Sequence, residues 1–435
     1  MNAGAFGPGP SEQASPYRTT MEALLDTTRL LWPSPAESST NGRRRAGHDV
    51  VREFLLLPHR RQPRIALPVG SAAMVAEVLR KYSQGLTFAE RVGRTTLSGL
   101  VRLPGINATL TRTVPHRLTV SAPAGHADGA FESYLSGILD NDVVIGVNLG
   151  QPRANRKPVV QALTADGRTL AFVKVGTSGA SKRLVRGEAE ALYSFWASGP
   201  PGDGLRVPRV IHYGQWRGLE VLVLSPLRPS STRWRRRNAV PTIAMRALGT
   251  HLGTSSSILA EGPAWERAHA ASTALADKEQ AARFERIVAA VGARYGSTPL
   301  TVGAWHGDWT PWNMAWDGDN LLLWDFERFA AGVPLGFDLA HYHLQSVLRD
   351  RGEAAAGRQI RAELAAPDGA GRPVRKAMTS DADALAGNDP EAVLAGYLVE
   401  LARRYVLASE PAEGTPLRAR TEWLIALLYS LVVRR

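Results

Sequence analysis

The residues best suited to chemistry are two aspartates and an asparagine in the last third of the chain. Asp308 and Asn313 lie five residues apart on a segment that Pro311 predicts to be a loop. The apolar run Leu321–Trp324 predicts a strand that delivers Asp325 to its end, where a carboxylate can be held stiffly at a pocket. Two carboxylates and one carboxamide are hard oxygen ligands, which Mg²⁺ takes while keeping room for phosphate oxygens and water. The sequence therefore predicts a magnesium site.

These residues belong to two short motifs with a recognisable order. The motif His306-Gly-Asp-x4-Asn313 is followed by Trp324-Asp-Phe-Glu327. The pair resembles the catalytic and metal-binding loops of the aminoglycoside phosphotransferase and choline kinase family, which are small-molecule relatives of the protein kinases. The segment 332–340, GVPLGFDLA, is similar to that family's segment ending in Asp-Leu-Ala.

The resemblance implies a role for each of these polar residues. Asp308 would be the catalytic base or the residue that orients the acceptor hydroxyl, and Asn313 and Asp325 would bind magnesium. Glu327 would serve a second metal or support the first, and Asp338 would cap the next helix and buttress the catalytic loop. The alternative for any single aspartate is a solvated loop carboxylate.

A kinase-like nucleotide lobe also needs a lysine for the α- and β-phosphates and a glutamate that holds it. Lys174 lies between apolar neighbours on a predicted strand, which is unusual for a lysine unless its charge is paired. Glu188 follows on the helix predicted over Lys182–Trp196, and Glu190 points about 200° away from it around that helix. We expect Glu188 to be the partner; the alternative is a solvated Lys174 at a sheet edge.

The remaining predicted nucleotide contacts rest on weaker patterns. Gly146 and Gly150 flank a hairpin that lacks the G-x-G-x-x-G pattern, so they either help to cradle phosphate or only permit a bulge or close packing. Residues 221–227 are the predicted hinge beside the adenine. His306 is expected to fix the catalytic loop through hydrogen bonds rather than to transfer protons. The tryptophans of the catalytic loop form either an aromatic cage for a cationic acceptor or part of the core: Trp305, Trp309, Trp312 and Trp316.

The elements that must position these residues change character along the chain. Strands are predicted at 54–57, 64–69, 143–150, 158–163, 169–175 and 219–225, and a helix at 71–82. The three strands from 143 to 175 are predicted to form an antiparallel meander. Helices are predicted at 20–32, 241–259, 263–295, 338–351, 390–408 and 416–433, with a mobile loop at 366–389.

This order predicts an α+β, bilobal protein-kinase-like fold with an antiparallel-sheet N-lobe, a mainly helical C-lobe and an N-terminal extension. The boundaries are a mostly disordered tail at 1–45, an α/β extension of unknown role at 46–130, the nucleotide-binding N-lobe at 131–228 and the C-lobe at 229–435.

Composition narrows the function classes further. The 435 residues include no cysteine, which excludes disulfides, thiol catalysis and cysteine-ligated metals. No long apolar run and no signal peptide is present, so we expect a soluble cytoplasmic protein. The net charge of +12 favours an anionic partner, although genomic base composition also explains an arginine bias.

The predicted activity is a Mg-dependent transfer of the γ-phosphate of ATP or GTP to a hydroxyl of a small molecule, such as a sugar, an amino alcohol or a glycan-related acceptor. The basic composition disfavours a polycationic aminoglycoside acceptor. The alternative is a catalytically silent kinase-like module that binds nucleotide and a polyanionic partner. No nucleic-acid motif occurs, membrane contact is not expected, and the oligomeric state stays open.

Overall fold

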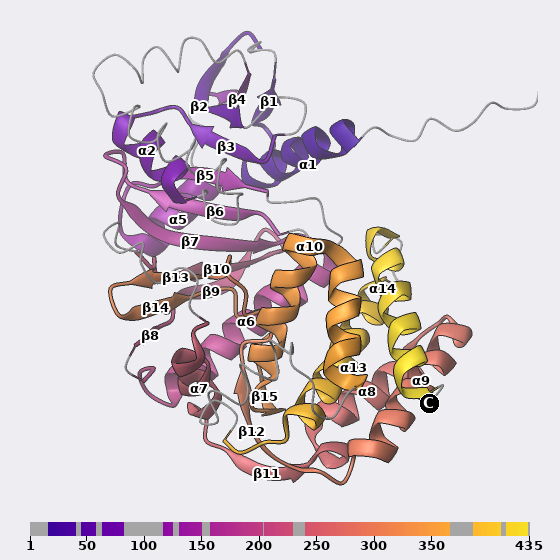
Figure 1. Cartoon of the computed structure of the whole chain (residues 1–435). Helices are drawn as coiled ribbons and strands as arrows, with labels where there is room; N and C mark the ends of the chain where they lie inside the picture. Colours follow the sequence, from indigo (N-terminus) through magenta and orange to yellow (C-terminus); the bar gives the residue numbers. More distant parts are fainter. Residues whose placement is uncertain are drawn as a thin grey trace, which may run out of the picture. The chain divides into compact units, whose positions relative to one another are not determined.

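The computed structural model describes residues 16–40, 45–57, 63–81, 116–124, 130–149, 157–202, 204–228, 240–365, 386–409 and 415–433. The chain divides into two compact units, residues 1–152 with 156–173 and residues 153–155 with 174–435 (Figure 1). The division runs through the range 131–228. Gly150, the predicted hairpin tip beyond it and most of the predicted loop at 366–389 lie outside the described residues.

An antiparallel sheet is the frame of the first unit. Its strands lie in the order β1-β4-β2-β3-β5-β6-β7. The elements are α1 (Pro16–Leu31), β1 (Glu37–Ser39), β2 (His48–Leu57), β3 (Ile65–Pro68), α2 (Ala72–Lys81), β4 (Arg117–Pro123), α5 (Phe131–Leu139), β5 (Val144–Asn148), β6 (Val159–Leu163) and β7 (Thr169–Gly176). The predicted helix at 71–82 and five of the six predicted strands are therefore present in this unit, and the sixth, at 219–225, is β10 (Leu219–Leu224) of the second unit. The last three residues of β7 belong to the second unit.

The N-terminal extension continues the sheet of the predicted nucleotide lobe. Strand β3 pairs antiparallel with β5, with Ile65 opposite Asn148 and Ala66 opposite Val147. All four residues of β3 are buried, and Leu67 packs in one apolar cluster with Val75 of α2. Residues 46–130 thus supply strands to the same sheet, a point that the sequence left open.

The segment 1–45, predicted to be mostly a disordered tail, is ordered over its described part. Helix α1 and strand β1 lie there, and β1 pairs with β4. Burial of apolar side chains stabilises this segment, because Leu24, Leu31 and Trp32 are at most 2% exposed.

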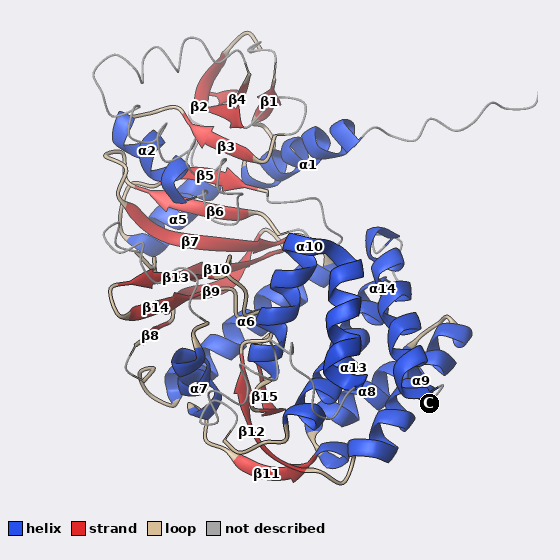
Figure 2. Cartoon of the chain, in the orientation of Figure 1, coloured by secondary structure: helices blue, strands red, loops and turns tan. Residues whose placement is uncertain are grey.

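The second unit is mainly helical, as predicted (Figure 2). Its helices are α6 (Gly179–Ala197), α7 (Thr242–Thr250), η3 (Leu259–Glu261), α8 (Pro263–Ala274), α9 (Lys278–Tyr295), α10 (Phe337–Ala365), α13 (Pro390–Ser409), α14 (Thr415–Leu428) and η5 (Tyr429–Val433). Its strands are β8 (Leu205–Arg206), β9 (Val210–Trp216), β10 (Leu219–Leu224), β11 (Ser255–Ile258), β12 (Pro299–Trp305), β13 (Met314–Asp317), β14 (Asn320–Leu323) and β15 (Ala330–Pro334). None of the helices in the described part of the chain is both long and apolar enough to cross a bilayer.

Two helix predictions were wrong in this unit. The predicted helix 241–259 ends at Thr250, because Gly253 adopts a φ of +83° and the following serine-rich segment pairs with β12 as strand β11. The predicted helix 263–295 is two helices. Leu275 is extended, and the carboxylate of Asp277 caps a new helix by accepting a hydrogen bond from the Gln280 N–H.

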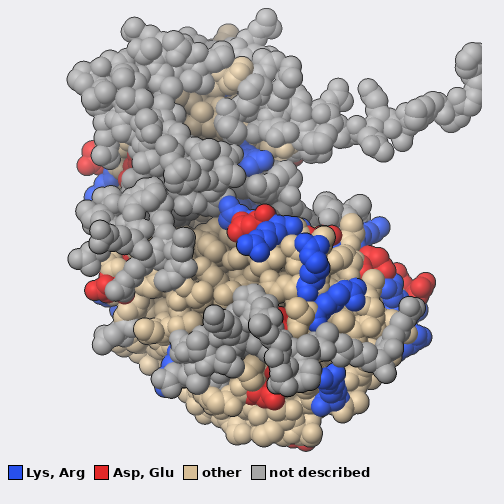
Figure 3. Space-filling model, viewed as in Figure 1, with Lys and Arg blue, Asp and Glu red and all other residues tan. Residues whose placement is uncertain are grey.

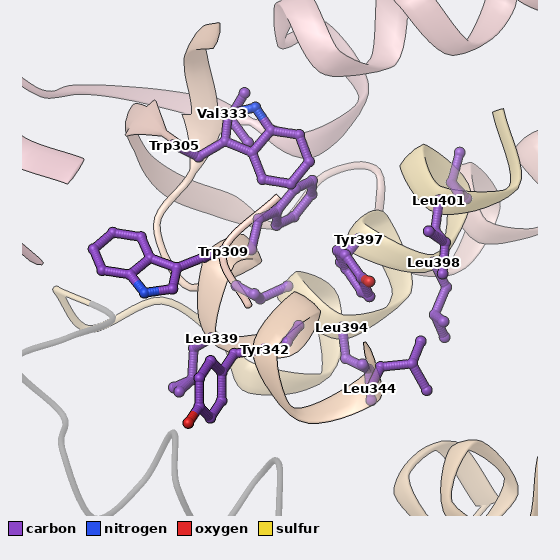
Figure 4. Packing of buried hydrophobic residues seen from close by; sticks show 14 of the residues in the cluster. Trp305, Trp309, Val333, Leu339, Tyr342, Leu344, Leu394, Tyr397, Leu398 and Leu401 are labelled. Atoms are coloured by element: carbon purple, nitrogen blue, oxygen red, sulfur yellow. The ribbon is translucent and has the colours of Figure 1, made fainter. Parts of the chain in front are cut away.

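One helix lies at the centre of the C-terminal helices. Helix α13 packs against α8, α9, α10 and α14. The cluster around it is apolar and aromatic, with Trp305, Trp309 and Tyr397 each no more than 2% exposed (Figure 4). Strand β12, which carries Trp305 into the catalytic loop, is therefore anchored in this core.

Strand β12 and helix α7 approach each other so closely that only glycine fits. A Cβ atom on Gly303 would lie 2.1 Å from the carbonyl oxygen of Gly249. This oxygen is backbone and cannot move aside by a side-chain rotation. The contact fixes the strand that leads into the catalytic loop.

We therefore expect Gly303→Ala to lower the free energy of unfolding by about 3 kcal/mol, because the added methyl group overpacks a backbone contact. Denaturant unfolding measures this change. The matched control is Gly357→Ala in α10, where a Cβ atom would meet Trp423 at an ordinary 3.7 Å. This variant should be as stable as the parent or about 1 kcal/mol more stable, because alanine favours a helix. Equal stabilities of the two variants would contradict the close approach.

Candidate functional site

The catalytic loop begins where strand β12 ends, and His306 is its first residue. The ring of His306 is fully buried. Its Nδ1 accepts a hydrogen bond from the Asp308 N–H at 3.3 Å, so its Nε2 carries the proton and donates to the Trp324 carbonyl at 3.1 Å. Burial lowers the pKa of His306 to about 4, which keeps the ring neutral at pH 7. This neutral histidine joins the loop of Asp308 to the loop of Asp325.

Asp338, the second residue of α10, holds the turn of the catalytic loop. Its two carboxylate oxygens accept hydrogen bonds from the N–H groups of His306 at 2.7 Å and of Gly307 at 3.0 Å. Gly307 has a φ of +79°, and a Cβ atom there would lie 2.4 Å from the Arg328 carbonyl oxygen. Burial raises the pKa of Asp338 to about 7, although both N–H bonds act in the opposite direction. Asp338 thus buttresses the loop as the resemblance implied. The implied helix cap is wrong, because Asp338 lies inside α10 and its oxygens bind N–H groups of the loop.

The carboxylate of Asp308 is held on both sides. Its Oδ2 accepts a hydrogen bond from Asn313 Nδ2 at 2.8 Å, and its Oδ1 accepts one from His341 Nε2 at 3.2 Å. Burial acts to raise the pKa of Asp308, but the His341 hydrogen bond and charge interactions outweigh it and the pKa is lowered. Asp308 is therefore ionised at neutral pH.

Lys174 at the end of β7 forms a buried ion cluster. Its Nζ lies 2.6 Å from both carboxylate oxygens of Glu188 on α6 and 2.5 Å from Oδ1 of Asp325. Burial acts to lower the pKa of Lys174, but the two carboxylates outweigh it and raise the pKa, so the ammonium group stays charged. Glu188 is fully buried and Glu190 is exposed, which gives the pairing expected from the helix geometry.

Asp325 follows the hairpin of β13 and β14 in an unusual conformation. It has a φ of +75°, which is uncommon for a residue with a side chain and often marks a functional site. The next residue, Phe326, donates its N–H to Glu188 Oε1 at 3.1 Å and buries its ring 4.8 Å from that of His306. The backbone is thus fixed on both sides of Asp325, whose side chain is 28% exposed.

Other predicted site residues lie apart from these contacts. Glu327 is 15% exposed, and its Oε1 lies 3.9 Å from Arg328 Nε. Gly146 lies in β5 of the first unit, where a Cβ atom would meet Pro68 at 3.4 Å and Val78 at 3.5 Å, an ordinary packing distance. Its surroundings are those of a packed sheet position.

The predicted hinge and the tryptophans near the loop are largely part of the core. Val221 and Leu224 of β10 are buried. Trp305 and Trp309 are also buried and belong to the apolar core, whereas Trp312 and Trp316 are partly exposed. The core interpretation therefore holds for the two buried tryptophans.

Sequence reasoning missed three residues that support the catalytic loop. His341 contacts Asp308, and Tyr397 of α13 contacts His341. Arg404, also on α13, donates to the Gly307 carbonyl at 2.5 Å and stacks 4.3 Å from the centroid of the Trp305 ring. His341 could have been found, because it lies three residues after Asp338 on the same face of a predicted helix. Tyr397 and Arg404 carry no such signal.

Comparisons with known proteins assign the chain to a family. A family model described as the phosphotransferase enzyme family matches residues 153–377, which is more than half of the chain. No curated protein sequence matches.

Several solved structures resemble the chain at low sequence identity. A thermostable mutant of aminoglycoside phosphotransferase APH(4)-Ia, in ternary complex with ADP and hygromycin B, is 12% identical with a TM-score of 0.42, over 68% of this chain and 98% of that one. ADP-bound aminoglycoside phosphotransferase APH(2'')-Ib is 12% identical with a TM-score of 0.39, over 69% and 96%. Amicoumacin kinase hAmiN, in complex with AMP-PNP, Ca²⁺ and Ami, is 10% identical with a TM-score of 0.38, over 67% and 89%.

These TM-scores are too low to support an assignment, which rests on the family match. The family and the α+β class predicted from the sequence are confirmed. The chain belongs to the phosphotransferase enzyme family.

Proposed function

We propose that this phosphotransferase moves the γ-phosphoryl group of ATP or GTP to a hydroxyl of a small molecule with the help of Mg²⁺. The observation that carries the proposal is the Lys174 ammonium group held within 2.6 Å of both Glu188 and Asp325. A kinase-type site needs this lysine–glutamate pair beside a metal-binding aspartate. A buried lysine that served only the fold would not require a second, partly exposed carboxylate.

The donor set of the second unit fits magnesium. Asn313 uses its Nδ2 to bond Asp308, which leaves its Oδ1 as the atom that can face a cation, and Asp325 offers a carboxylate. No group of three or more histidine or acidic side chains that could hold a metal occurs among the described residues. Magnesium needs no such group, because it binds through one or two carboxylates together with substrate phosphates. The ion would neutralise charge on those phosphates, and Glu327 would support its site.

Asp308 would align the acceptor and take its proton. Because its pKa is lowered, the carboxylate is ready to accept a hydrogen bond from a hydroxyl at neutral pH. Phosphoryl transfer leaves little covalent work for the protein, so positioning of this kind supplies much of the rate. His306 would keep the loop in place as a neutral hydrogen-bonding group and not as a proton donor.

Lys174 would steady the α- and β-phosphates. Its ammonium group contacts Asp325, which would also be a ligand of the metal ion, and Glu188 holds the lysine from the other side. Phosphate contacts from Gly146 and Gly150 stay predictions.

The charges around Asp308 bear on the acceptor. Arg328 and Arg404 both act to lower the pKa of His341, and the Arg349 guanidinium lies 4.6 Å from the centroid of the Trp312 ring. Figure 3 shows basic side chains gathered over the helical part of the second unit. A polycation would be repelled here, so we propose a sugar or glycan-related acceptor ahead of an amino alcohol.

The first test is turnover of ATP and GTP by the purified protein, with and without Mg²⁺ and with a panel of hydroxyl acceptors. We expect magnesium-dependent release of the nucleoside diphosphate, and a loss of at least about 100-fold in Asp308→Ala because the orienting carboxylate is gone. Circular dichroism and the melting temperature of Asp308→Ala should show that the fold survives.

A thermal-shift titration separates binding from chemistry. Nucleotide should raise the melting temperature, and Mg²⁺ should add to this rise in the parent but not in Asp325→Asn. Stabilisation by nucleotide with no turnover under any condition would favour the silent-module alternative. No stabilisation by any nucleotide would contradict nucleotide binding altogether.

The second test concerns Glu188. Glu188→Gln removes a buried charge and leaves Lys174 with Asp325 alone, so we expect kcat/KM to fall by about 10- to 100-fold. The matched control is Glu190→Gln on the exposed face of the same helix, which should leave kcat/KM within about twofold. Similar losses in both variants would mean that Glu188 has no specific role.

The third test uses the pH dependence of stability. The pKa of His306 is about 4 in the folded protein and 6.5 for an ordinary histidine, so between these pH values the unfolded chain binds a proton that the folded protein does not. Its contribution is fully present above pH 6.5 and is lost as the pH falls towards 4, by about 3 kcal/mol in total. The free energy of unfolding of the parent should therefore decline relative to that of His306→Asn as the pH is lowered from 7.5 to 4.5.

Asp338 acts in the opposite direction over an overlapping pH range, because its folded pKa is raised to about 7. Both proteins in the comparison retain Asp338, so its effect cancels in the difference. Parallel curves for the parent and His306→Asn would contradict a neutral His306 in the folded protein.

A further inference from the structure

A buried hydrogen-bonded chain runs from helix α13 to the proposed catalytic carboxylate. The Tyr397 hydroxyl lies 3.1 Å from His341 Nδ1, and His341 Nε2 lies 3.2 Å from Asp308 Oδ1. Tyr397 is 1% exposed and His341 is 3% exposed. Figure 4 shows Tyr397 pointing from α13 into the apolar cluster. Because both side chains are almost fully buried, their hydrogen bonds strengthen one another.

The chemistry of the two end groups fixes the direction of both hydrogen bonds. Burial raises the pKa of Tyr397 well above its ordinary value, so its hydroxyl keeps its proton. The ionised Asp308 can only accept, so Nε2 of a neutral His341 is the donor to it, and Nδ1 accepts from the Tyr397 hydroxyl. His341 therefore carries its own proton on Nε2, and this N–H group donates a hydrogen bond to the ionised Asp308. Burial lowers the pKa of His341, which leaves a neutral ring with a single tautomer.

This chain acts on the side chain of Asp308 and not on the main chain of the loop. The main chain around Asp308 is already held, because Asp338 binds two N–H groups and Arg404 binds the Gly307 carbonyl. A carboxylate still rotates about its terminal bond, since that torsion has broad minima. Asn313 restrains one oxygen and His341 restrains the other.

We propose that His341 is a positioning residue, which Tyr397 locks in one tautomer so that the carboxylate plane of Asp308 faces the acceptor hydroxyl. This inference rests on the proposed function of Asp308. It reverses the familiar order of a catalytic triad, where a carboxylate orients a histidine. It also gives α13 a part in the reaction, although Tyr397 lies outside the segment 153–377 that matches the family model.

The tautomer is tested by nitrogen NMR of the histidine rings in the full chain, with the His341 signals identified by their absence in His341→Leu. We expect the Nε2-protonated tautomer at pH 7.5 in the parent. In Tyr397→Phe, which removes one oxygen atom, Nδ1 loses its donor and the signals should shift towards a mixture of tautomers. An Nδ1-protonated ring, an imidazolium, or signals unchanged by Tyr397→Phe would overturn the proposal.

The effect on catalysis is tested by phosphate release from ATP with water as the acceptor, which needs no knowledge of the natural one. Misplacing a reacting group by about 1 Å can cost about 100-fold in rate. We therefore expect kcat to fall by about 100-fold in His341→Leu and by about 10-fold in Tyr397→Phe, with the KM for ATP within about twofold. His341→Gln, which keeps an N–H donor facing Asp308, should recover part of the loss.

A double variant separates positioning from general stability. If Tyr397 acts through His341, adding Tyr397→Phe to His341→Leu should lower kcat no further. The matched control is Tyr295→Phe in α9. It removes a buried hydroxyl that donates at 2.8 Å to Glu391 of α13, the helix that also carries Tyr397. It should lower the melting temperature as Tyr397→Phe does but leave kcat unchanged.

Two results would overturn the positioning role: a parent-like kcat in both His341→Leu and Tyr397→Phe, or an equal loss of kcat in Tyr295→Phe. If the parent turns over neither ATP nor GTP with any acceptor, the proposed function fails on its own account. The tautomer of His341 and its response to Tyr397→Phe then decide the geometry independently.

Discussion

The buried ammonium group of Lys174 is the interaction on which the rest of the site depends. An unpaired charge at this depth would be strongly destabilising, and removing one partner of such a cluster typically costs about 3–5 kcal/mol. Two carboxylates from different elements pair with this charge, Glu188 on α6 and Asp325 in the loop after β14. The need to pair one charge therefore brings together a strand, a helix and a loop that are distant in sequence. Glu188 adds a bond to the Phe326 N–H, which transmits this constraint to the backbone.

A second set of buried polar groups holds the catalytic loop. These groups form hydrogen bonds to the main chain, whereas Lys174 forms ion pairs with side chains. Asp338 and Arg404 each bind buried main-chain groups of the loop, and His306 binds the Trp324 carbonyl of the loop that carries Asp325. Arg404 is itself held by Glu400, whose pKa is lowered to about 2: burial acts to raise it, but the hydrogen bond from Arg403 and the charge of Arg404 outweigh this. The loop is thus rigid before any ligand arrives, which is the condition for catalysis by positioning.

Site residues that belong to a short sequence motif or to one face of a helix could be predicted from the sequence. Asp308, Asn313 and Asp325 share short motifs, and helix geometry alone distinguished Glu188 from Glu190. Predictions failed where distant pairing overrides local preference. The serine-rich segment of β11 has no alternation of apolar and polar residues, and it becomes a strand because β12 offers an open edge. Tyr397 is one aromatic residue on an apolar helix, and only the packing of α13 against α10 gives it a polar partner.

The pairing of β3 with β5 has a consequence for how the protein can be divided. Strand β5 has β6 on one side and β3 on the other, so a polypeptide starting at residue 131 would present a bare row of amide and carbonyl groups along β5. Such an open margin recruits other chains into intermolecular sheets. The N-terminal segment thus covers the edge of β5, even though it precedes every residue proposed to take part in the reaction.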